Sequence, residues 1–80
     1  MSEALIAERG KTHGDFSTRA GTAQALKEVM SRGANWNDLP PSQREALDMI
    51  AVKVSRILHG DPSLADHWDD IAGYALLGRG

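Results

Sequence analysis

The feature that most limits what this chain can fold into is its short length together with its lack of cysteine: 80 residues and none. Residues 1–80 suffice for one domain, whose small core buries only about two-thirds of the unfolded surface. Chains of this size usually gain stability from a disulfide, a bound metal or a partner subunit. Without cysteine, disulfides and thiolate metal sites are excluded. We therefore expect a single domain that forms a homo-oligomer.

The charge pattern excludes several classes of partner. Nine basic and eleven acidic residues are spread along the chain, for a net charge of −2. Duplex DNA is not an expected partner, because its binding needs clustered Lys or Arg. No apolar run approaches the roughly 20 residues of a membrane span, so no membrane partner is expected. The first residues lack the basic and apolar regions of a signal peptide, which predicts a cytoplasmic protein.

Capping residues and glycines predict an all-α bundle of about four helices. The segments 2–9, 16–32, 42–59 and 63–77 are expected to be helical. Ser2 and Asp15 are expected N-caps, and Gly10 and Gly33 are expected stops. The last two helices each begin with a capping-box pattern, Ser42 to Glu45 and Ser63 to Asp66. Polar residues 10–15 form a predicted loop between the first two helices.

The predicted third helix carries apolar residues on two sides. Its core stripe has helical spacing and consists of Leu47, Ile50, Ala51, Val54, Ile57 and Leu58. Met49 and Val52 lie on the other side of the same helix. A helix that is apolar on two sides needs two neighbours, so a second subunit is expected to complete the bundle.

Two acidic groups on the last two helices form the first candidate site. Glu45 and Asp48 are three residues apart, as are Asp66 and Asp69, with Asp70 adjacent. Carboxylates from two helices suit Mg²⁺ or Mn²⁺, and such an ion can activate water for phosphate hydrolysis. The alternative is structural, because Glu45 and Asp66 also fit capping boxes and a positive helix N-terminus.

Basic residues form the second candidate site, for phosphate. Lys53 and Arg56 are three residues apart in the third predicted helix, and Arg56 shares a face with Glu45. Lys11 lies between Gly10 and Gly14, in a loop that precedes a helix N-terminus and is a candidate anion-binding turn. The alternatives are an exposed basic pair and an ordinary connecting loop.

Three segments carry a family resemblance: 8–15 (ERGKTHGD), 53–56 (KVSR) and 66–75 (DHWDDIAGYA). They resemble small phage and prophage proteins of unassigned function, which are distantly similar to the all-α MazG-like nucleoside triphosphate pyrophosphohydrolases. Those enzymes bind Mg²⁺ through paired acids on two helices and form dimers or tetramers. The resemblance implies Glu45 with Asp48 as the first acidic pair and Asp66 with Asp69 or Asp70 as the second. All five acids would be catalytic, and the metal ligands would be Glu45, Asp48, Asp66 and Asp70. It also implies Lys53 or Arg56 as phosphate contacts.

The sequence departs from the MazG-like pattern in its shorter acids and shorter chain, so three functions stay open. The first is a Mg²⁺-dependent nucleotide pyrophosphohydrolase. The second is a non-catalytic oligomer that binds a nucleotide or a nucleotide-derived signal. The third is a small phage effector that docks on a host protein through Met49, Val52 and Trp36.

Overall fold

The computed structural model describes residues 2–80, and Met1 lies outside them. The described residues form helices and turns without any strand, which confirms the all-α prediction. The elements are α1 Glu3–His13, α2 Phe16–Ser31, the short 3₁₀ helix Trp36–Asp38, α3 Pro41–His59 and α4 Ala65–Arg79. Among residues 2–80, no helix is both long enough and apolar enough to cross a membrane.

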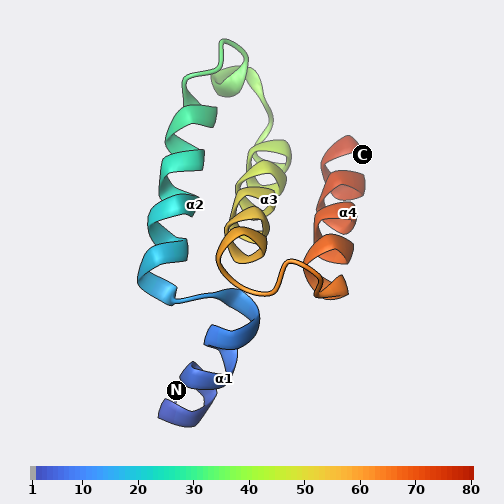
Figure 1. Ribbon diagram of the computed structural model, residues 1–80. Coiled ribbons are helices and arrows are strands. Elements are labelled where there is room, and N and C mark those ends of the chain that lie inside the picture. The colour runs from blue at the N-terminus through green and yellow to red at the C-terminus, as the bar shows by residue number, and fades with distance from the viewer. Residues whose placement is uncertain (1) are drawn as a thin grey trace.

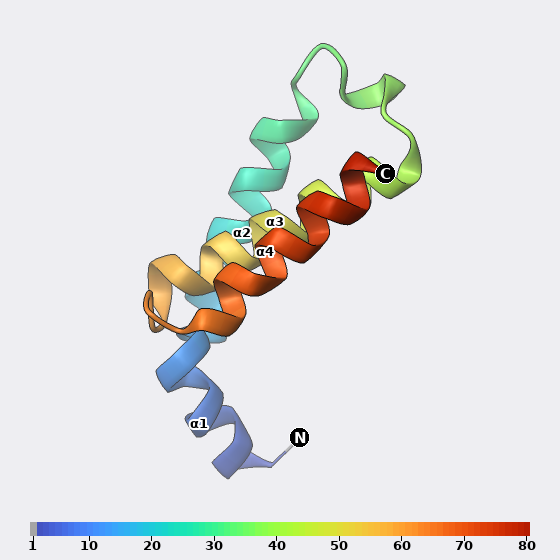
Figure 2. The ribbon, with the colours of Figure 1, turned by 90° about the vertical axis from the view of Figure 1, so that its right-hand side faces the viewer.

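Helix α3 is the centre of the bundle (Figure 1). It packs against α2 on one side and α4 on the other, and the chain direction reverses at each step. Helix α1 contacts the end of this three-helix unit at which α2 begins and α3 ends, and projects away from it, as Figure 2 shows from the side. Residues from α1, α2 and α3 therefore meet at one end of the molecule.

The helix starts confirm two of the four predicted caps. The Ser2 hydroxyl accepts a hydrogen bond from the Leu5 amide at 3.2 Å, and Asp15 Oδ2 accepts one from the Thr18 amide at 3.1 Å. Each side chain satisfies an amide that the first helical turn leaves free. Both predicted caps lie beside the helix that they start, so their geometry depends on local sequence alone.

Neither predicted capping box forms. Helix α3 starts at Pro41, one residue before Ser42, and has no side-chain cap; proline is favoured at this position because it has no amide to satisfy. The amide of Ser63 donates to Asp61 Oδ1 at 2.9 Å, and this turn delays the start of α4 to Ala65. In both places a neighbouring residue provides a more stable local arrangement than the serine cap.

The predicted loop at residues 10–15 is also wrong, because α1 continues through Gly10 and Lys11 to His13. Gly14 ends the helix with a positive φ of 84°, and its amide donates to the Gly10 carbonyl. The anion-binding turn expected around Lys11 therefore does not exist. In its place is one helical turn followed by a sharp corner at Gly14.

The corner at Gly14 is held against the α3–α4 connection by backbone contacts. The Asp61 amide donates to the Thr12 carbonyl at 2.9 Å. A Cβ on Gly14 would lie 2.5 Å from the His59 carbonyl oxygen, and one on Gly60 would overlap the Thr12 carbonyl. Two glycines thus allow two backbones to pass at a distance that no side chain permits.

The core contains little apolar volume. Its fully buried hydrophobic residues are Ala23, Ala46 and Ala51, whereas Leu47 and Leu58 of the predicted stripe are 38% and 63% exposed. Ala51 is therefore the one member of that stripe that becomes fully buried. The buried polar residues are Lys53, Ser55 and His67. An alanine core permits close helix packing but contributes little hydrophobic free energy.

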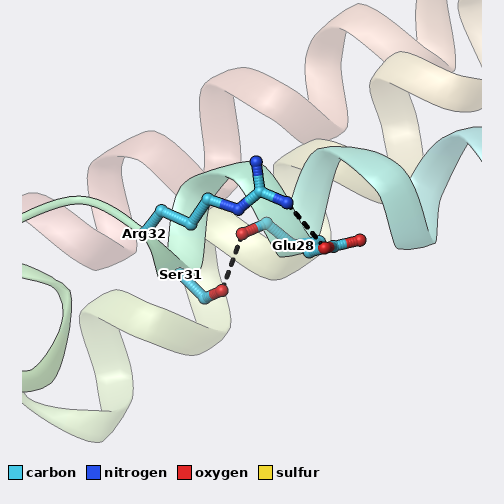
Figure 3. A network of polar contacts seen from close by, with 3 residues as sticks. All are labelled: Glu28, Ser31 and Arg32. Atoms are coloured by element: carbon cyan, nitrogen blue, oxygen red, sulfur yellow. Dashed lines mark hydrogen bonds and ion pairs between the residues drawn. The ribbon is translucent and has the colours of Figure 1, made fainter.

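The C-terminal end of α2 carries a small polar network (Figure 3). Arg32 Nη2 donates to Glu28 Oε1 at 2.7 Å, and the Ser31 hydroxyl donates to the Glu28 carbonyl at 2.7 Å. The Arg32 and Glu28 side chains are both 68% exposed, so the ion pair contributes about 0.3–0.5 kcal/mol. This network marks the end of α2 and takes no part in the site described below.

Candidate functional site

A cleft of about 730 Å³ opens where α1, α2 and α3 meet. It is lined by Ile6, Ala7, Arg9, Gly10, Gly14, Asp15, Phe16, Arg19 and Arg56. Its cationic residues come from three helices: Arg9 from α1, Arg19 from α2 and Arg56 from α3. We call this feature the arginine cleft.

The arginine cleft has more positive charge than its surroundings neutralise. None of its three arginines forms an ion pair with a carboxylate within residues 2–80. Asp15, the acid in the lining, caps α2 through the amide and hydroxyl of Thr18. Because arginine stays charged in proteins, three guanidinium groups near one another repel unless an anion binds between them.

Burial makes this excess charge more costly. The Nε atoms of Arg19 and Arg56 are buried without a hydrogen-bond partner. Burial lowers the pKa of Arg56 below its usual range, and the positive charges of Arg19 and Arg9 lower it further. A buried donor without an acceptor costs about 1–3 kcal/mol, and more when charged. An anion bound beside these groups would offset the repulsion between the positive charges.

One wall of the cleft is apolar and aromatic. Phe16 is 68% exposed although it lines the cleft, and the Arg19 guanidinium carbon lies 5.0 Å from the centre of its ring. This is cation–π geometry, which holds the arginine and the ring together. Ile6 and Ala7 extend the apolar lining. The cleft therefore offers charge for an anionic group and a flat apolar surface for an attached ring.

A polar cluster of Thr12, His13 and His67 adjoins the arginine cleft. His67 is 2% exposed and its Nε2 donates to the Thr12 carbonyl at 2.9 Å, which fixes the proton on that nitrogen. The rings of His13 and His67 meet edge to face with centroids 4.9 Å apart. Burial, followed by the charge of Arg56, lowers the pKa of His13. Positive charge from the cleft therefore extends to this cluster.

Lys53 lies elsewhere and already has a partner. It is 8% exposed, and its Nζ forms an ion pair with Asp70 Oδ2 at 2.8 Å across the α3–α4 contact. The hydrogen bond from Lys53 lowers the pKa of the Asp70 carboxyl. Of the three predicted phosphate contacts, Arg56 lines the cleft, whereas Lys53 is paired and exposed Lys11 is not part of the lining.

The outermost candidate acids, Glu45 and Asp66, lie far apart within one chain. Gln43 Nε2 donates to the Gly78 carbonyl, and Lys53 pairs with Asp70, so the start of α3 lies beside the end of α4. At 1.5 Å per residue, this register separates Glu45 from Asp66 by more than about 15 Å along the helices. Within residues 2–80, no three Asp, Glu or His side chains are arranged to hold a metal.

A magnesium site built from Glu45, Asp48, Asp66, Asp69 and Asp70 would therefore need two chains or ligands from a bound triphosphate. Asp70 would also have to leave Lys53, which its carboxylate neutralises. The residues of one chain fit Mg²⁺ poorly, and the predicted magnesium site stays a prediction.

Comparison with known proteins identifies a family but does not indicate a function. A family model described as a domain of unknown function, DUF6378, matches residues 1–80. The chain belongs to this family. No curated protein and no solved structure matches this DUF6378 chain. The phage context and the likeness to MazG-like enzymes stay predictions, because the family description supports neither.

Sequence reasoning missed two residues of the cleft in this DUF6378 domain. Neither Arg19 nor Phe16 was singled out as a site residue, yet both line the cleft. The two residues follow the Asp15 cap and are three positions apart, which places both on one face of the first turns of α2. This spacing was the signal that could have identified them. Sequence alone could not show that Arg9 and Arg56 lie near them.

Proposed function

We propose that the protein binds a nucleotide or a nucleotide-derived small molecule, with its phosphate groups in the arginine cleft. The observation that supports this most is the convergence from three helices of Arg9, Arg19 and Arg56, none of which forms an ion pair within residues 2–80. Guanidinium groups present planar arrays of donors that match phosphate oxygens. A phosphate group bound between these guanidinium groups would offset the repulsion between the arginines.

The rest of the ligand is inferred from the walls of the cleft. An exposed phenylalanine ring beside an arginine suits stacking of an aromatic base, which contributes about 1–3 kcal/mol in nucleic-acid binders. Phe16 is 68% exposed, so it can accept such a base without rearrangement of the core. The volume of about 730 Å³ is within the usual range for sites of small molecules and cofactors.

Binding is better supported than hydrolysis. A MazG-like reaction needs paired acids around Mg²⁺, and in one chain Glu45 and Asp66 lie at different heights along α3 and α4. The hydrolase therefore depends on an assembly of chains, whereas the arginine cleft is formed within one. Docking of a host protein has less support, because Trp36, Met49 and Val52 are each half-buried within this chain.

Titration calorimetry with ATP, GTP, pyrophosphate and inorganic phosphate tests the proposal. We expect Arg19→Gln and Arg56→Gln to weaken binding by roughly 10- to 100-fold, because each removes charge-assisted hydrogen bonds of about 1.5–3 kcal/mol. Arg32→Gln is the matched control, since Arg32 is exposed at the other end of α2 and pairs with Glu28.

Chromatography of the ligand after incubation with Mg²⁺ separates binding from hydrolysis, and we expect the nucleotide to be recovered intact. Release of monophosphate and pyrophosphate, lost in Asp48→Ala, would favour the hydrolase instead. The binding proposal fails if none of the four anions binds, or if Arg32→Gln weakens binding as much as Arg19→Gln does.

A further inference from the structure

The end of the bundle away from the arginine cleft has a second hollow of a different kind. A groove of about 350 Å³ lies between α3 and α4. It is lined by Leu39, Gln43, Ala46, Leu47, Ile50, Tyr74, Ala75, Gly78 and Arg79. Most of these residues are apolar, and we call the feature the α3–α4 groove.

Small residues leave the hollow of this groove, and large apolar residues lie beside it. Gly78 is so close to α3 that a Cβ on it would lie 3.0 Å from the Cβ of Ala46. Ala75, one turn before Arg79, is exposed in the lining. Leu47 is 38% exposed in the groove, and Leu76, next to Ala75, is 63% exposed. The hollow at Ala75 and Gly78 and the exposed Leu47 and Leu76 thus lie on the same two helices, α3 and α4.

The surface area of the whole chain, to which the projecting helix α1 without buried residues contributes (Figure 2), favours association with a second copy. A folded monomer of 8.6 kDa exposes about 4,700 Å² by the usual scaling, whereas this chain exposes 5463 Å². The excess is about 800 Å², the area that each partner typically buries in a stable protein–protein interface. The fully buried hydrophobic residues are three alanines, while nine large apolar residues are exposed. Association would therefore bury apolar area that the isolated chain leaves in water.

We infer that the α3–α4 groove is the interface of a homodimer, in which a second copy of this chain covers the groove around Leu47 and Ala75. In a two-fold interface the same patch faces itself, so it must contain both the protruding and the receiving surface. Leu47 and Leu76 provide the first, and the hollow at Ala46, Ala75 and Gly78 provides the second. The inference does not depend on the proposed function, because the arginine cleft shares no lining residue with this groove.

The test is the mass of the protein in solution, by light scattering after size-exclusion chromatography over a range of concentrations. We expect twice 8.6 kDa for the wild-type chain and 8.6 kDa for Ala75→Arg, since the arginine would fill the groove and place a charge there. Ala25→Arg is the matched control, because Ala25 is an exposed alanine on α2 outside the groove. It should leave the dimer intact.

Circular dichroism checks that Ala75→Arg keeps its helices, and Leu47→Glu is a second variant that reaches the groove from α3. A wild-type chain that stays at 8.6 kDa at every concentration would overturn the inference. So would a dimer that persists in both folded groove variants. Anion binding, measured on the same samples, reports separately on the arginine cleft.

Discussion

The arginine cleft and the α3–α4 groove lie toward opposite ends of α3 and are incomplete in different ways. Arg56, near the C-terminal end of the helix, belongs to a partly apolar cleft in which the arginines lack ion-pair partners within residues 2–80. Ala46, Leu47 and Ile50, nearer its start, belong to an apolar groove that lacks a cover. Unpaired positive charge favours binding of a small anion, whereas exposed apolar area favours contact with another protein surface. One helix thus contributes residues to both proposed binding sites.

The two regions also differ in how they are held together. The cleft depends on backbone contacts between Gly14 and His59 and between Thr12 and Asp61, which are distant in sequence. The groove depends on close side-chain packing of α3 on α4, with one bond from Gln43 to Gly78. A cleft built on a fixed backbone corner is preorganised for its ligand. A groove between two helices has walls that can adjust to a partner.

Substitution of Gly14 should have the largest effect, because it disrupts the backbone corner beside the arginine cleft. In Gly14→Ala the alanine must adopt a φ of 84° and its Cβ would lie 2.5 Å from the His59 carbonyl oxygen. With its ψ of 171°, this backbone conformation is essentially restricted to glycine and costs other residues about 1–3 kcal/mol, and the overlap adds to it. We expect urea denaturation to show a loss of roughly 2–4 kcal/mol.

The control for Gly14→Ala is Gly21→Ala. Gly21 lies inside α2, and no atom lies within 4 Å of the position that its Cβ would take. Alanine should therefore be neutral or should stabilise the helix by up to about 1 kcal/mol. Equal urea midpoints for the two variants would show that the corner does not hold the cleft as described.

Asp70 provides a second, intermediate test, because it decides whether an acid of α4 belongs to the fold or to a metal site. In Asp70→Asn the buried Lys53 ammonium loses its ion-pair partner, and an unpaired buried charge destabilises the folded state. We expect Tm to fall by several degrees without any added metal. Asp69→Asn is the control, since Asp69 is exposed and forms no ion pair within residues 2–80.

Addition of Mg²⁺ to the same proteins tests the alternative role of Asp70. A structural role predicts that the wild-type Tm without ligand does not change with millimolar Mg²⁺. Stabilisation of the wild type by Mg²⁺ that disappears in Asp70→Asn would instead support the metal site predicted from the sequence.

The sequence was most informative where the deciding interaction is local. Ser2 and Asp15 cap their helices as predicted, because each side chain bonds an amide three residues ahead. The glycine stop at Gly10 failed because glycine only weakens a helix interior, by about 1 kcal/mol. The last turn of α1 is fixed instead by contacts of Thr12 with Asp61 and His67, which no local pattern reveals.

For the candidate sites, too, local features could be predicted from the sequence, whereas contacts between helices could not. The sequence identified Arg56 as a candidate phosphate contact, and Arg56 lines the arginine cleft. It could not show that Lys53 is neutralised by Asp70, 17 positions away, because that depends on the register of α3 against α4. The separation of Glu45 from Asp66 along the helices depends on the same register. Distances between helices are set by packing, and here small residues such as Gly78 and Ala46 determine them.

The pH dependence of stability gives the smallest effect and probes the charge of the arginine cleft directly. Burial and the nearby charges of Arg56, His67, Arg19 and Arg9 lower the pKa of His13 below its unfolded value of 6.5. The folded state therefore binds fewer protons than the unfolded state as pH falls through 6.5. Stability from a neutral His13 is present above pH 6.5 and is lost progressively below it.

We expect Tm to decrease from pH 7.5 to pH 5.5 and to decrease less in His13→Gln, which has no proton to gain. His59→Gln serves as the control, because His59 is exposed and bonded to Thr22 on the far side of the corner. Pyrophosphate should reduce the pH effect in the wild type, since a bound anion offsets the arginine charges that disfavour a charged His13. Identical pH profiles for the wild type and His13→Gln would mean that the charge of the cleft does not reach this histidine.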